Sequence, residues 1–590
     1  MKKYILLIVS SMMLASCVDT IILPDDRTVD EDFWKTKQQV SSMVTAAYSS
    51  MASYNVMEDL LVWGNFRTDE VFGPSSSVDN STEKTALNEI LAVNIQTTNM
   101  YAKWASIYEV INRCNIVLDR AEAVQTEDPS YTLGDYQTDR SQMLALRALC
   151  YFYLVRNFRD VPYITEAYMN SSQNMQVAQS APAVVLQHCI DDLEEAAVNP
   201  IKAIGKTTSD WQRVGLMTDD AINTLLADIY LWRASVTHSQ ADYAQCIAYC
   251  DKVIQSKKDY REAHPRGYNQ AKKEYPLADA VDIYSELFVS QNAEESIFEL
   301  QSRNNTAINK YYYKYKSANN NGGEGWMRAT NMFANTYATI NINNTLSNSN
   351  LYFAGDMRYY AACYTEPTSD DVYHIRKLVS NASVSGKSST AVREVLGTLD
   401  RNLNIYRLTD IMLMKAEAIV QQVDTNMAKT VQDSLLRGAF SLVQAVNSRA
   451  LHPDNQGDSI KWTSAAATSR FSTLTKDQFE QLILQERMRE FCFEGRRWYD
   501  LMRYNYRHVN GVDYNRTLAE IVDDGGEPVA NYKEMLVLMT RKRSDASGVQ
   551  AKMANEAYLY MPIPNSDIIV CPLLRQNPAY KDASDYKKNY

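Results

Sequence analysis

The segment from Leu482 to Arg503 constrains the fold most, because it combines a helical apolar pattern with an unusual density of charge. Its apolar side chains recur at the spacing of a helix that buries one face, at Leu482, Ile483, Met488, Phe491, Cys492, Trp498 and Leu501. The charged residues between them are Glu486, Arg487, Arg489, Glu490, Glu494, Arg496, Arg497 and Asp500. Gly495 predicts a close backbone approach or a kink. We therefore expect one helix that packs through charged as well as apolar side chains.

Two interpretations of the carboxylates in this segment are open. Glu490 and Glu494 share a helical face, and a pair of carboxyl groups is what glycosidases use for acid/base chemistry. Alternatively each glutamate has an arginine partner, as Glu494 and Arg497 would at their three-residue spacing. Guanidinium groups suit such pairing and would keep both acids ionised. We favour the ion network, which makes the helix structural.

A second pattern runs through much of the chain and predicts helical hairpins. A small residue stands three positions before a large one within the helical runs Ala105–Tyr108, Ala148–Tyr151, Ala227–Tyr230 and Ala416–Ile419. Small residues where two helices cross are typical of tetratricopeptide repeats, although alanine at crossings is common in any all-α protein. Because the units are unevenly spaced, we predict an all-α, tetratricopeptide-like scaffold with long irregular loops. The Pro-rich end, Tyr558–Tyr580, predicts an extended strap across the helices.

The segment 302–356 interrupts the helical pattern and is rich in asparagine, with tyrosines and Trp326 interleaved. An irregular insertion of this length in a compact protein is usually functional or disordered. Its aromatic content argues against disorder. We expect this insertion to carry function.

The N-terminus predicts a lipoprotein signal over residues 1–16. Lys2 and Lys3 precede an apolar run that ends at Ala15, which is too short to span a membrane. The sequence up to Cys17 resembles a bacterial lipobox, so cleavage there would leave Cys17 to carry the lipid. Several acyl chains anchor a protein stably where one does not. The alternative is an ordinary signal peptide followed by a chance cysteine.

Composition and motifs argue against several functional classes. The net charge of −11 disfavours a nucleic-acid partner, which would require clustered Lys and Arg. The six histidines are far apart and the nine cysteines form no Cys-x-x-Cys, so no metal site, disulfide framework or cofactor is predicted. Ser385–Ser388 resembles the end of a phosphate loop, but Asn381 stands where a glycine belongs. No nucleophile elbow is present, and we predict no catalytic residue.

Four segments together resemble the SusD/RagB family, whose members are surface lipoproteins of Bacteroidota that work with a TonB-dependent outer-membrane porin. The segments occur in the family's order and are Ala145–Tyr163, Ile405–Ala418, Gln485–Leu501, and Tyr558–Pro564 with Gln576–Tyr580. The resemblance spans nearly the whole mature chain. It implies an N-terminal helical region over 17–220 and a C-terminal region over 221–590 that contains the insertion 302–356.

The resemblance also implies a binding protein that captures a glycan and passes it to a SusC-like porin at the outer membrane, facing outward. Sugars require flat aromatic rings for stacking and polar side chains for their hydroxyl groups. Two stretches have that chemistry, so the candidate ligand residues are Asn65, Arg67, Asp69, Tyr311, Tyr313, Asn321 and Trp326. Three alternatives remain: peptide cargo as in RagB-like members, a glycoside hydrolase that uses Glu490 and Glu494, and a scaffold lipoprotein without ligand.

Overall fold

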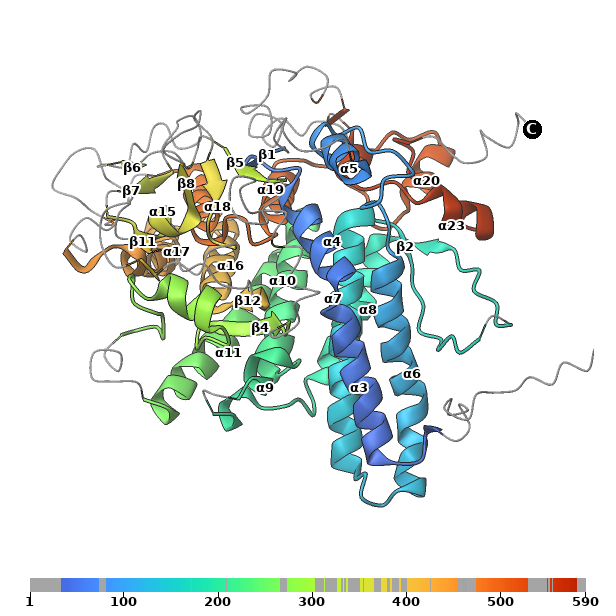
Figure 1. Cartoon of the computed structure of the whole chain (residues 1–590). Helices are drawn as coiled ribbons and strands as arrows, with labels where there is room; N and C mark the ends of the chain where they lie inside the picture. The colour runs from blue at the N-terminus through green and yellow to red at the C-terminus, as the bar shows by residue number, and fades with distance from the viewer. Residues whose placement is uncertain are drawn as a thin grey trace, which may run out of the picture.

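The computed structural model describes most of residues 33–580. The longer stretches outside the described residues are 74–80, 266–272, 303–325, 338–350, 366–372, 385–391, 394–400, 455–473 and 529–548, within which a few single residues such as Tyr312 are placed. The described residues are mostly helical with short strands, which confirms the predicted all-α class (Figure 1). None of the helices in this part of the chain is long and apolar enough to cross a lipid bilayer.

The scaffold is a series of helices in which each packs against the next along the chain (Figure 1). In order they are α6 (Ala105–Glu127), α7 (Leu133–Phe158), α8 (Pro182–Ala196), α10 (Asp219–Thr237), α11 (Gln240–Ala263), α16 (Leu408–Gln421) and α17 (Lys429–Ala450). Two N-terminal helices flank the series: α3 (Lys37–Met51) packs on α6, and α4 (Tyr54–Asn65) follows it. This consecutive packing confirms the helical-hairpin scaffold.

In three of the four predicted repeat units, the small residue is buried, as expected at a helix crossing. Ala148, Ala227 and Ala416 have no exposed surface, so neighbouring helices approach closely at these positions. Ala105 is different, because it is exposed in the first turn of α6 and does not lie at a helix crossing. The repeat prediction was therefore wrong for the unit that begins at Ala105.

Short strands hold the irregular part of the chain on the scaffold. β4 (Ser296–Leu300) pairs with β12 (Leu403–Arg407), and the two enclose the long irregular region in sequence. A four-stranded sheet has the order β1 (Val71–Phe72), β5 (Arg328–Ala329), β9 (Tyr373–Ile375), β8 (Cys363–Thr365). The remaining strands are β2 (Val161–Pro162), β3 (Gln179–Ser180), β6 (Thr336–Tyr337), β7 (Tyr352–Phe353), β10 (Ser383–Val384) and β11 (Val392–Arg393). Shorter helices are α5 (Thr82–Leu91), η1 (Ala203–Gly205), α9 (Gln212–Gly215), η2 (Ser285–Ser290), α15 (Met357–Ala362) and α20 (Leu518–Asp523).

The charged segment near the C-terminus is two helices, where the sequence predicted one. α18 (Lys476–Phe491) begins at a capping box of Thr475 and Gln478, and α19 (Arg497–Arg507) follows after a turn. In that turn Phe493 and Gly495 have φ of 65° and 77°, a backbone region that a helix cannot use. A Cβ on Gly64 of α4 would lie 1.9 Å from the Gly495 carbonyl oxygen. Gly495 thus marks the close approach that the sequence indicated.

The C-terminal segment is only partly the extended strap that its composition predicted. The chain is extended at Met561, whose amide donates to the Asn157 carbonyl at 2.7 Å on α7. Helical turns stand on either side of this contact, η8 (Glu556–Leu559) and α23 (Asn565–Val570). The eight described cysteines are all free, and all but Cys571 are buried.

Candidate functional site

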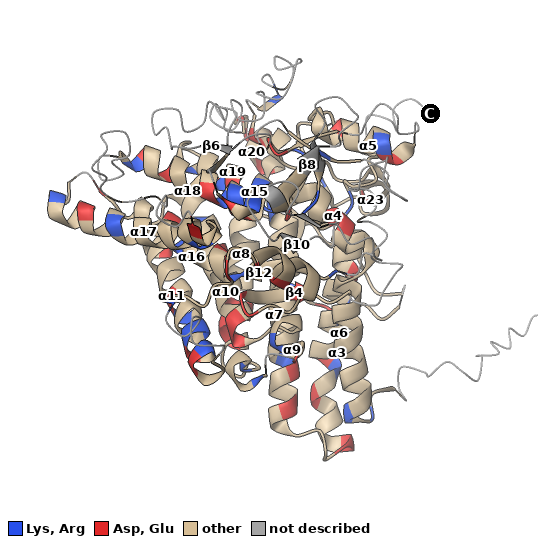
Figure 2. Cartoon of the chain, turned by 60° about the vertical axis from the view of Figure 1, so that its left-hand side comes forward, with Lys and Arg blue, Asp and Glu red and all other residues tan. Residues whose placement is uncertain are grey.

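A buried network of ion pairs surrounds Glu490 and Glu494, near the meeting point of α15, α18 and α19 (Figure 2). Glu490 accepts hydrogen bonds from Arg358 at 2.8 Å and from Arg449 at 2.5 Å. Arg407 bridges both carboxylates, contacting Glu490 and lying 2.9 Å from Glu494. The Nζ of Lys377 lies 2.6 Å from Glu494. The network that we favoured from the sequence is therefore present.

The cations keep both glutamates ionised. Burial opposes ionisation, but Arg449, Arg407 and Arg358 outweigh it and hold the pKa of Glu490 well below its ordinary value. Against the same opposing effect of burial, Arg407 and Lys377 lower the pKa of Glu494 to about 2. The two residues are only 2% and 6% exposed. A general acid must hold a proton near neutral pH and reach its substrate, so this pair is unsuited to glycosidase chemistry.

Asn65, Arg67 and Asp69 are structural, and their prediction as ligand contacts was wrong. All three are at most 1% exposed. Arg67 donates to the Leu559 carbonyl at 2.6 Å and stacks on Trp498. Asp69 forms a two-bond ion pair with Arg497, at 2.8 and 2.9 Å, so Arg497 does not pair with Glu494 as its spacing suggested.

Asn65 joins α4 to the turn between α18 and α19. Its side-chain amide donates to the Phe493 carbonyl at 3.1 Å, and its side-chain oxygen accepts from the Gly495 amide at 2.9 Å. Both halves of the amide are therefore used to satisfy backbone groups of a buried turn. Asn65 has no exposed surface with which to contact a ligand.

The structure does bring the two predicted ligand stretches together, through the sheet. β1, which follows Asp69, pairs with β5, which follows Trp326, in the register Val71 opposite Ala329. Thr330 strengthens the contact by donating its hydroxyl to the Asp69 carbonyl at 2.9 Å. Residues 74–80 and 303–325, which lie outside the described residues, adjoin these strands in sequence. Two stretches that are far apart in the sequence thus lie side by side in one strand pair.

We call the residues Phe72, Gly73 and Arg328 the sheet rim. Phe72 and Arg328 lie opposite each other across the β1–β5 pair, and the Arg328 guanidinium donates to the Gly73 carbonyl at 3.1 Å. All three are partly exposed, and burial lowers the pKa of Arg328 from its ordinary value. Sequence reasoning missed this rim, because its residues carry no motif and become neighbours only through strand pairing.

Of the remaining candidate ligand residues, Trp326 is buried and the other three lie outside the described residues. Trp326 is 4% exposed and belongs to the main hydrophobic core, so its face is covered and the prediction of a stacking surface was wrong. Tyr311, Tyr313 and Asn321 lie outside the described residues, as do Cys17 and the Ser385–Ser388 loop. Among the described residues, no three His, Cys, Asp or Glu side chains are grouped in a way that would hold a metal ion.

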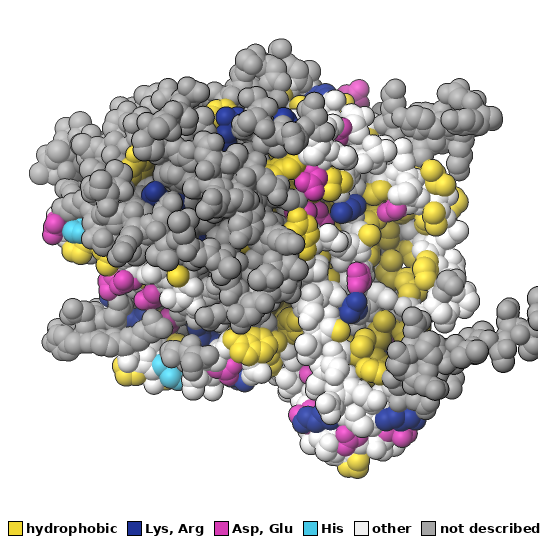
Figure 3. Space-filling model, viewed as in Figure 1, with side chains coloured by type: hydrophobic (Ala, Val, Ile, Leu, Met, Phe, Trp, Pro, Cys, Tyr) yellow, Lys and Arg dark blue, Asp and Glu magenta, His cyan; other side chains and the backbone are white. Residues whose placement is uncertain are grey.

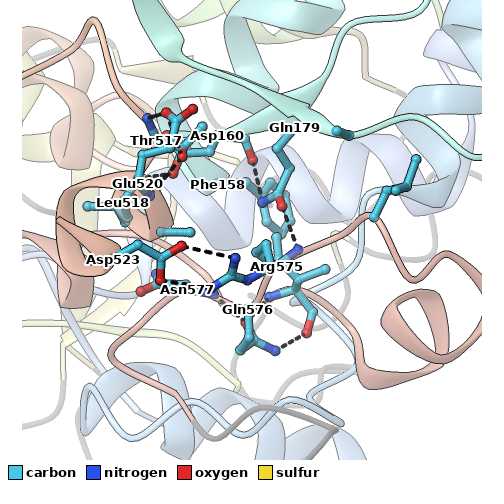
Figure 4. Close-up of a pocket in the computed structure, with 14 residues that line it drawn as sticks. Phe158, Asp160, Gln179, Thr517, Leu518, Glu520, Asp523, Arg575, Gln576 and Asn577 are labelled. Carbon is cyan, nitrogen blue, oxygen red and sulfur yellow. Dashed lines mark hydrogen bonds and ion pairs between the residues drawn. The ribbon is translucent and has the colours of Figure 1, made fainter.

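A small polar pocket of about 160 Å³ lies between α7, α20 and the C-terminal segment (Figure 4). Arg575 forms two 3.1 Å hydrogen bonds with Asp523, and its backbone amide donates to Gln179 at 2.8 Å. Asp160, deeper in the pocket, accepts from the Leu518 amide at 2.6 Å. Because these groups bind one another and the volume is far below that of a typical ligand site, we assign the pocket to fastening the C-terminus.

Comparison with known families identifies the chain. A family model described as "SusD family" matches residues 251–580. The chain belongs to the SusD family. A second model, described as "Starch-binding associating with outer membrane", matches residues 23–231.

SusD-family relatives match over most of their length. "SusD-like protein P38" of Formosa agariphila is 24% identical over 555 residues, which cover 88% of this chain and 96% of that protein. A "SusD-like protein" of Bacteroides ovatus is 22% identical over 621 residues, with 98% of both chains covered.

Solved structures agree on the SusD-like fold. A SusD superfamily protein from Bacteroides vulgatus matches with a TM-score of 0.62 at 16% identity, covering 93% of this chain and all of the other. "B. fragilis NanU" matches with a TM-score of 0.58 at 19% identity, covering 95% of this chain and all of the other.

Proposed function

We propose that this SusD-family protein is a lipid-anchored receptor at the outer-membrane surface that binds a nutrient oligosaccharide and delivers it to a SusC-like, TonB-dependent porin. The observation that carries the proposal is the match of both halves of the chain to SusD-family models, one of which is described as starch-binding and associated with the outer membrane. Capture and delivery require no bond-breaking group. This agrees with the locked state of Glu490 and Glu494.

The sheet rim supports the location of the proposed ligand site. It lies on the exposed edge where the stretches adjoining 74–80 and 303–325 meet, and Arg328 provides a charge-bearing hydrogen-bond donor there. Tyr311, Tyr313 and Asn321 belong to the second of these segments and have the ring and amide chemistry that sugars need. We propose that these three residues contact the glycan, with the rim as their base.

Affinity electrophoresis against a panel of neutral and acidic polysaccharides tests the binding proposal. The wild-type protein should be retarded by at least one polysaccharide, and the double variant Tyr311→Ala/Tyr313→Ala should lose most of that retardation. The matched control is Tyr168→Ala, which changes a half-buried tyrosine far in sequence from Tyr311 and Tyr313. It should migrate as wild type. Retention by peptides alone would replace the glycan with peptide cargo, and no retention by either class would favour a scaffold without ligand.

The anchor is tested separately at Cys17. In cells that make the wild-type chain, fractionation should place the protein with the outer membrane, and protease added to intact cells should cleave it. Cys17→Ser should release the protein in soluble form, because the acyl chains that hold it have no attachment point. A Cys17→Ser protein that stays with the membrane would refute lipid anchoring at this residue.

A further inference from the structure

A second cavity lies away from the sheet rim, between the N-terminal helices and the central part of the chain. It has a volume of about 310 Å³ and is lined by α3, α7, α9 and the end of β4. Figures 1 and 2 both place α9 toward the end of the molecule opposite β8, a strand of the rim's own sheet. The volume is at the lower end of the range of small-molecule sites, which starts near about 300 Å³.

Trp211 presents an aromatic ring at this cavity. Its side chain is 47% exposed, in contrast to the fully buried Trp63, Trp232 and Trp498. The ring packs against the backbone of Gly215, where an added Cβ would lie 2.6 Å from the ring and 2.8 Å from Gln301. Glycine at this position therefore leaves the space that the ring and the Gln301 side chain occupy. One side of the indole is supported and the rest of it is open, which is the arrangement that a stacking platform requires.

The polar lining is mostly neutral and suits hydroxyl groups. It consists of the hydroxyls of Ser41, Thr45, Tyr48 and Ser49, the amides of Gln142, Gln212 and Gln301, and the carboxyls of Asp139 and Glu299. Part of it is fixed in place: the Tyr48 hydroxyl accepts from the Met217 amide at 2.9 Å and donates to Gln142 at 3.1 Å. Fixed donors and acceptors bind a ligand without first losing side-chain entropy.

Glu299 has spare hydrogen-bonding capacity. It is 1% exposed, and its Oε2 accepts from the Asn292 amide at 3.1 Å and from Asn402 at 2.9 Å. Its Oε1 is buried without a hydrogen-bond partner among the described residues. A buried carboxylate oxygen that lacks a donor costs free energy, and a ligand hydroxyl in the cavity would supply that donor.

The charge of the lining restricts the ligand class. Asp139 and Glu299 contribute carboxyl groups, and no Lys or Arg is among the described residues that line the cavity. A sulfated or uronic-acid ligand would meet like charge without a cation among these lining residues to pair with it. A cationic amine would find carboxylates, but of the two rings among the described lining residues, Trp211 and Tyr48, Trp211 alone is largely exposed, which falls short of the aromatic cage that such cations prefer. A neutral polyhydroxylated ligand fits both the ring and the amides.

We propose that this cavity is a second binding site for a short neutral saccharide, with one sugar ring stacked on Trp211 and its hydroxyl groups held by the amides of α7 and α9 and by Glu299. The site is separate from the proposed rim site and does not depend on it. Two contact points on one receptor would let it hold a polysaccharide chain while the rim engages another part of it.

Saturation-transfer NMR and calorimetry with the mature chain test the proposal. The probes are short neutral oligosaccharides of glucose, mannose and galactose. Binding should weaken by about three- to tenfold or more in Trp211→Ala and recover in part in Trp211→Phe, which keeps a ring. Val570→Ala, another exposed apolar side chain, is the control and should bind as wild type, and all variants should melt like wild type.

The double variant Tyr311→Ala/Tyr313→Ala separates the two proposed sites. It should keep the Trp211-dependent binding even if it loses polysaccharide retention, and the reverse should hold for Trp211→Ala. Saccharide binding that is unchanged in Trp211→Ala, or no binding of any probe, would overturn the proposal. Trp211-dependent binding of choline or spermidine in place of the sugars would overturn the assigned ligand class.

Discussion

The ion network around Glu490 and the cavity beside Trp211 use polar side chains in opposite ways. In the network, Arg358, Arg407 and Arg449 surround the carboxylates, and the participants are buried. At the cavity most polar groups are neutral, one ring is open, and one Glu299 oxygen has no hydrogen-bond partner among the described residues. The difference teaches that the highest density of charge in this chain marks its internal architecture. We propose that recognition is left to neutral groups beside exposed rings.

The largest effect is expected from breaking the network. Arg407→Ala would leave Glu490 and Glu494 buried with fewer cations, and removing one partner of a buried ion pair costs about 3–5 kcal/mol. Chemical denaturation measures the change in the free energy of unfolding. The control is Arg113→Ala, which removes an exposed pair with Glu109 and should cost under about 1 kcal/mol. Equal effects of the two variants would remove the distinction between network and surface.

The network should also make the protein sensitive to acid. Arginines lower the pKa of Glu494, Glu417 and Glu480 to about 2, against the opposing effect of burial. A glutamate whose pKa is lower in the folded state stabilises the fold above its unfolded pKa of about 4.3, and this stability is lost as the pH falls toward 2. Each such carboxylate contributes on the order of 2–3 kcal/mol. Denaturation midpoints that stay constant from pH 5 to about 2.5 would contradict the lowered pKa values.

The turn between α18 and α19 allows a test of close backbone packing that involves no charged side chain. Gly64→Ala would place a Cβ 1.9 Å from the Gly495 carbonyl oxygen, and relieving that overlap should cost about 1–3 kcal/mol or more. Gly438→Ala is the matched control, because it is also helical but has open space around its Cβ. It should stabilise the protein by up to about 1 kcal/mol. Thermal melts of the two variants should therefore shift in opposite directions.

The smallest effect is expected at the exposed ion pair of the polar pocket. Arg575 and Asp523 are each about half exposed, so Arg575→Ala should change the free energy of unfolding by under about 1 kcal/mol (Figure 4). The same denaturation series measures it. A loss as large as that of Arg407→Ala would show that this pair fastens the C-terminus far more strongly than its exposure allows.

Local periodicity was enough to predict the helical scaffold and the ion network, and the reason is physical. Ala148, Ala227 and Ala416 mark helix crossings because close packing leaves room only for small side chains. Gly495 indicated a close approach or a kink, but the division into two helices was missed because Trp498 and Leu501 continue the apolar spacing after the break at Phe493. The helix ends there because α4 packs its backbone against the turn, an interaction from the far end of the chain.

The candidate site was harder to predict, since burial depends on distant partners. Asn65, Arg67 and Asp69 stand close to Trp63 and Phe66 in the sequence, as in a sugar-binding surface. Their partners in the structure are Phe493, Leu559 and Arg497. Nothing in the local sequence distinguishes a polar group that faces solvent from one that binds a distant carbonyl. Trp211 was missed because nothing in the local sequence indicates that its side chain is exposed. Exposed hydrophobic side chains occur at several places on the face in Figure 3, so hydrophobic character alone does not indicate burial.

The central claim is that this protein holds a glycan without cleaving it. The most direct measurement incubates the purified chain with a polysaccharide that retards it in affinity electrophoresis, and assays retention and new reducing ends in the same sample. We predict retention that depends on Tyr311 and Tyr313, with reducing ends equal to those of a protein-free control. Reducing ends that accumulate with time and disappear in Glu490→Gln, in a variant that remains folded, would contradict the account.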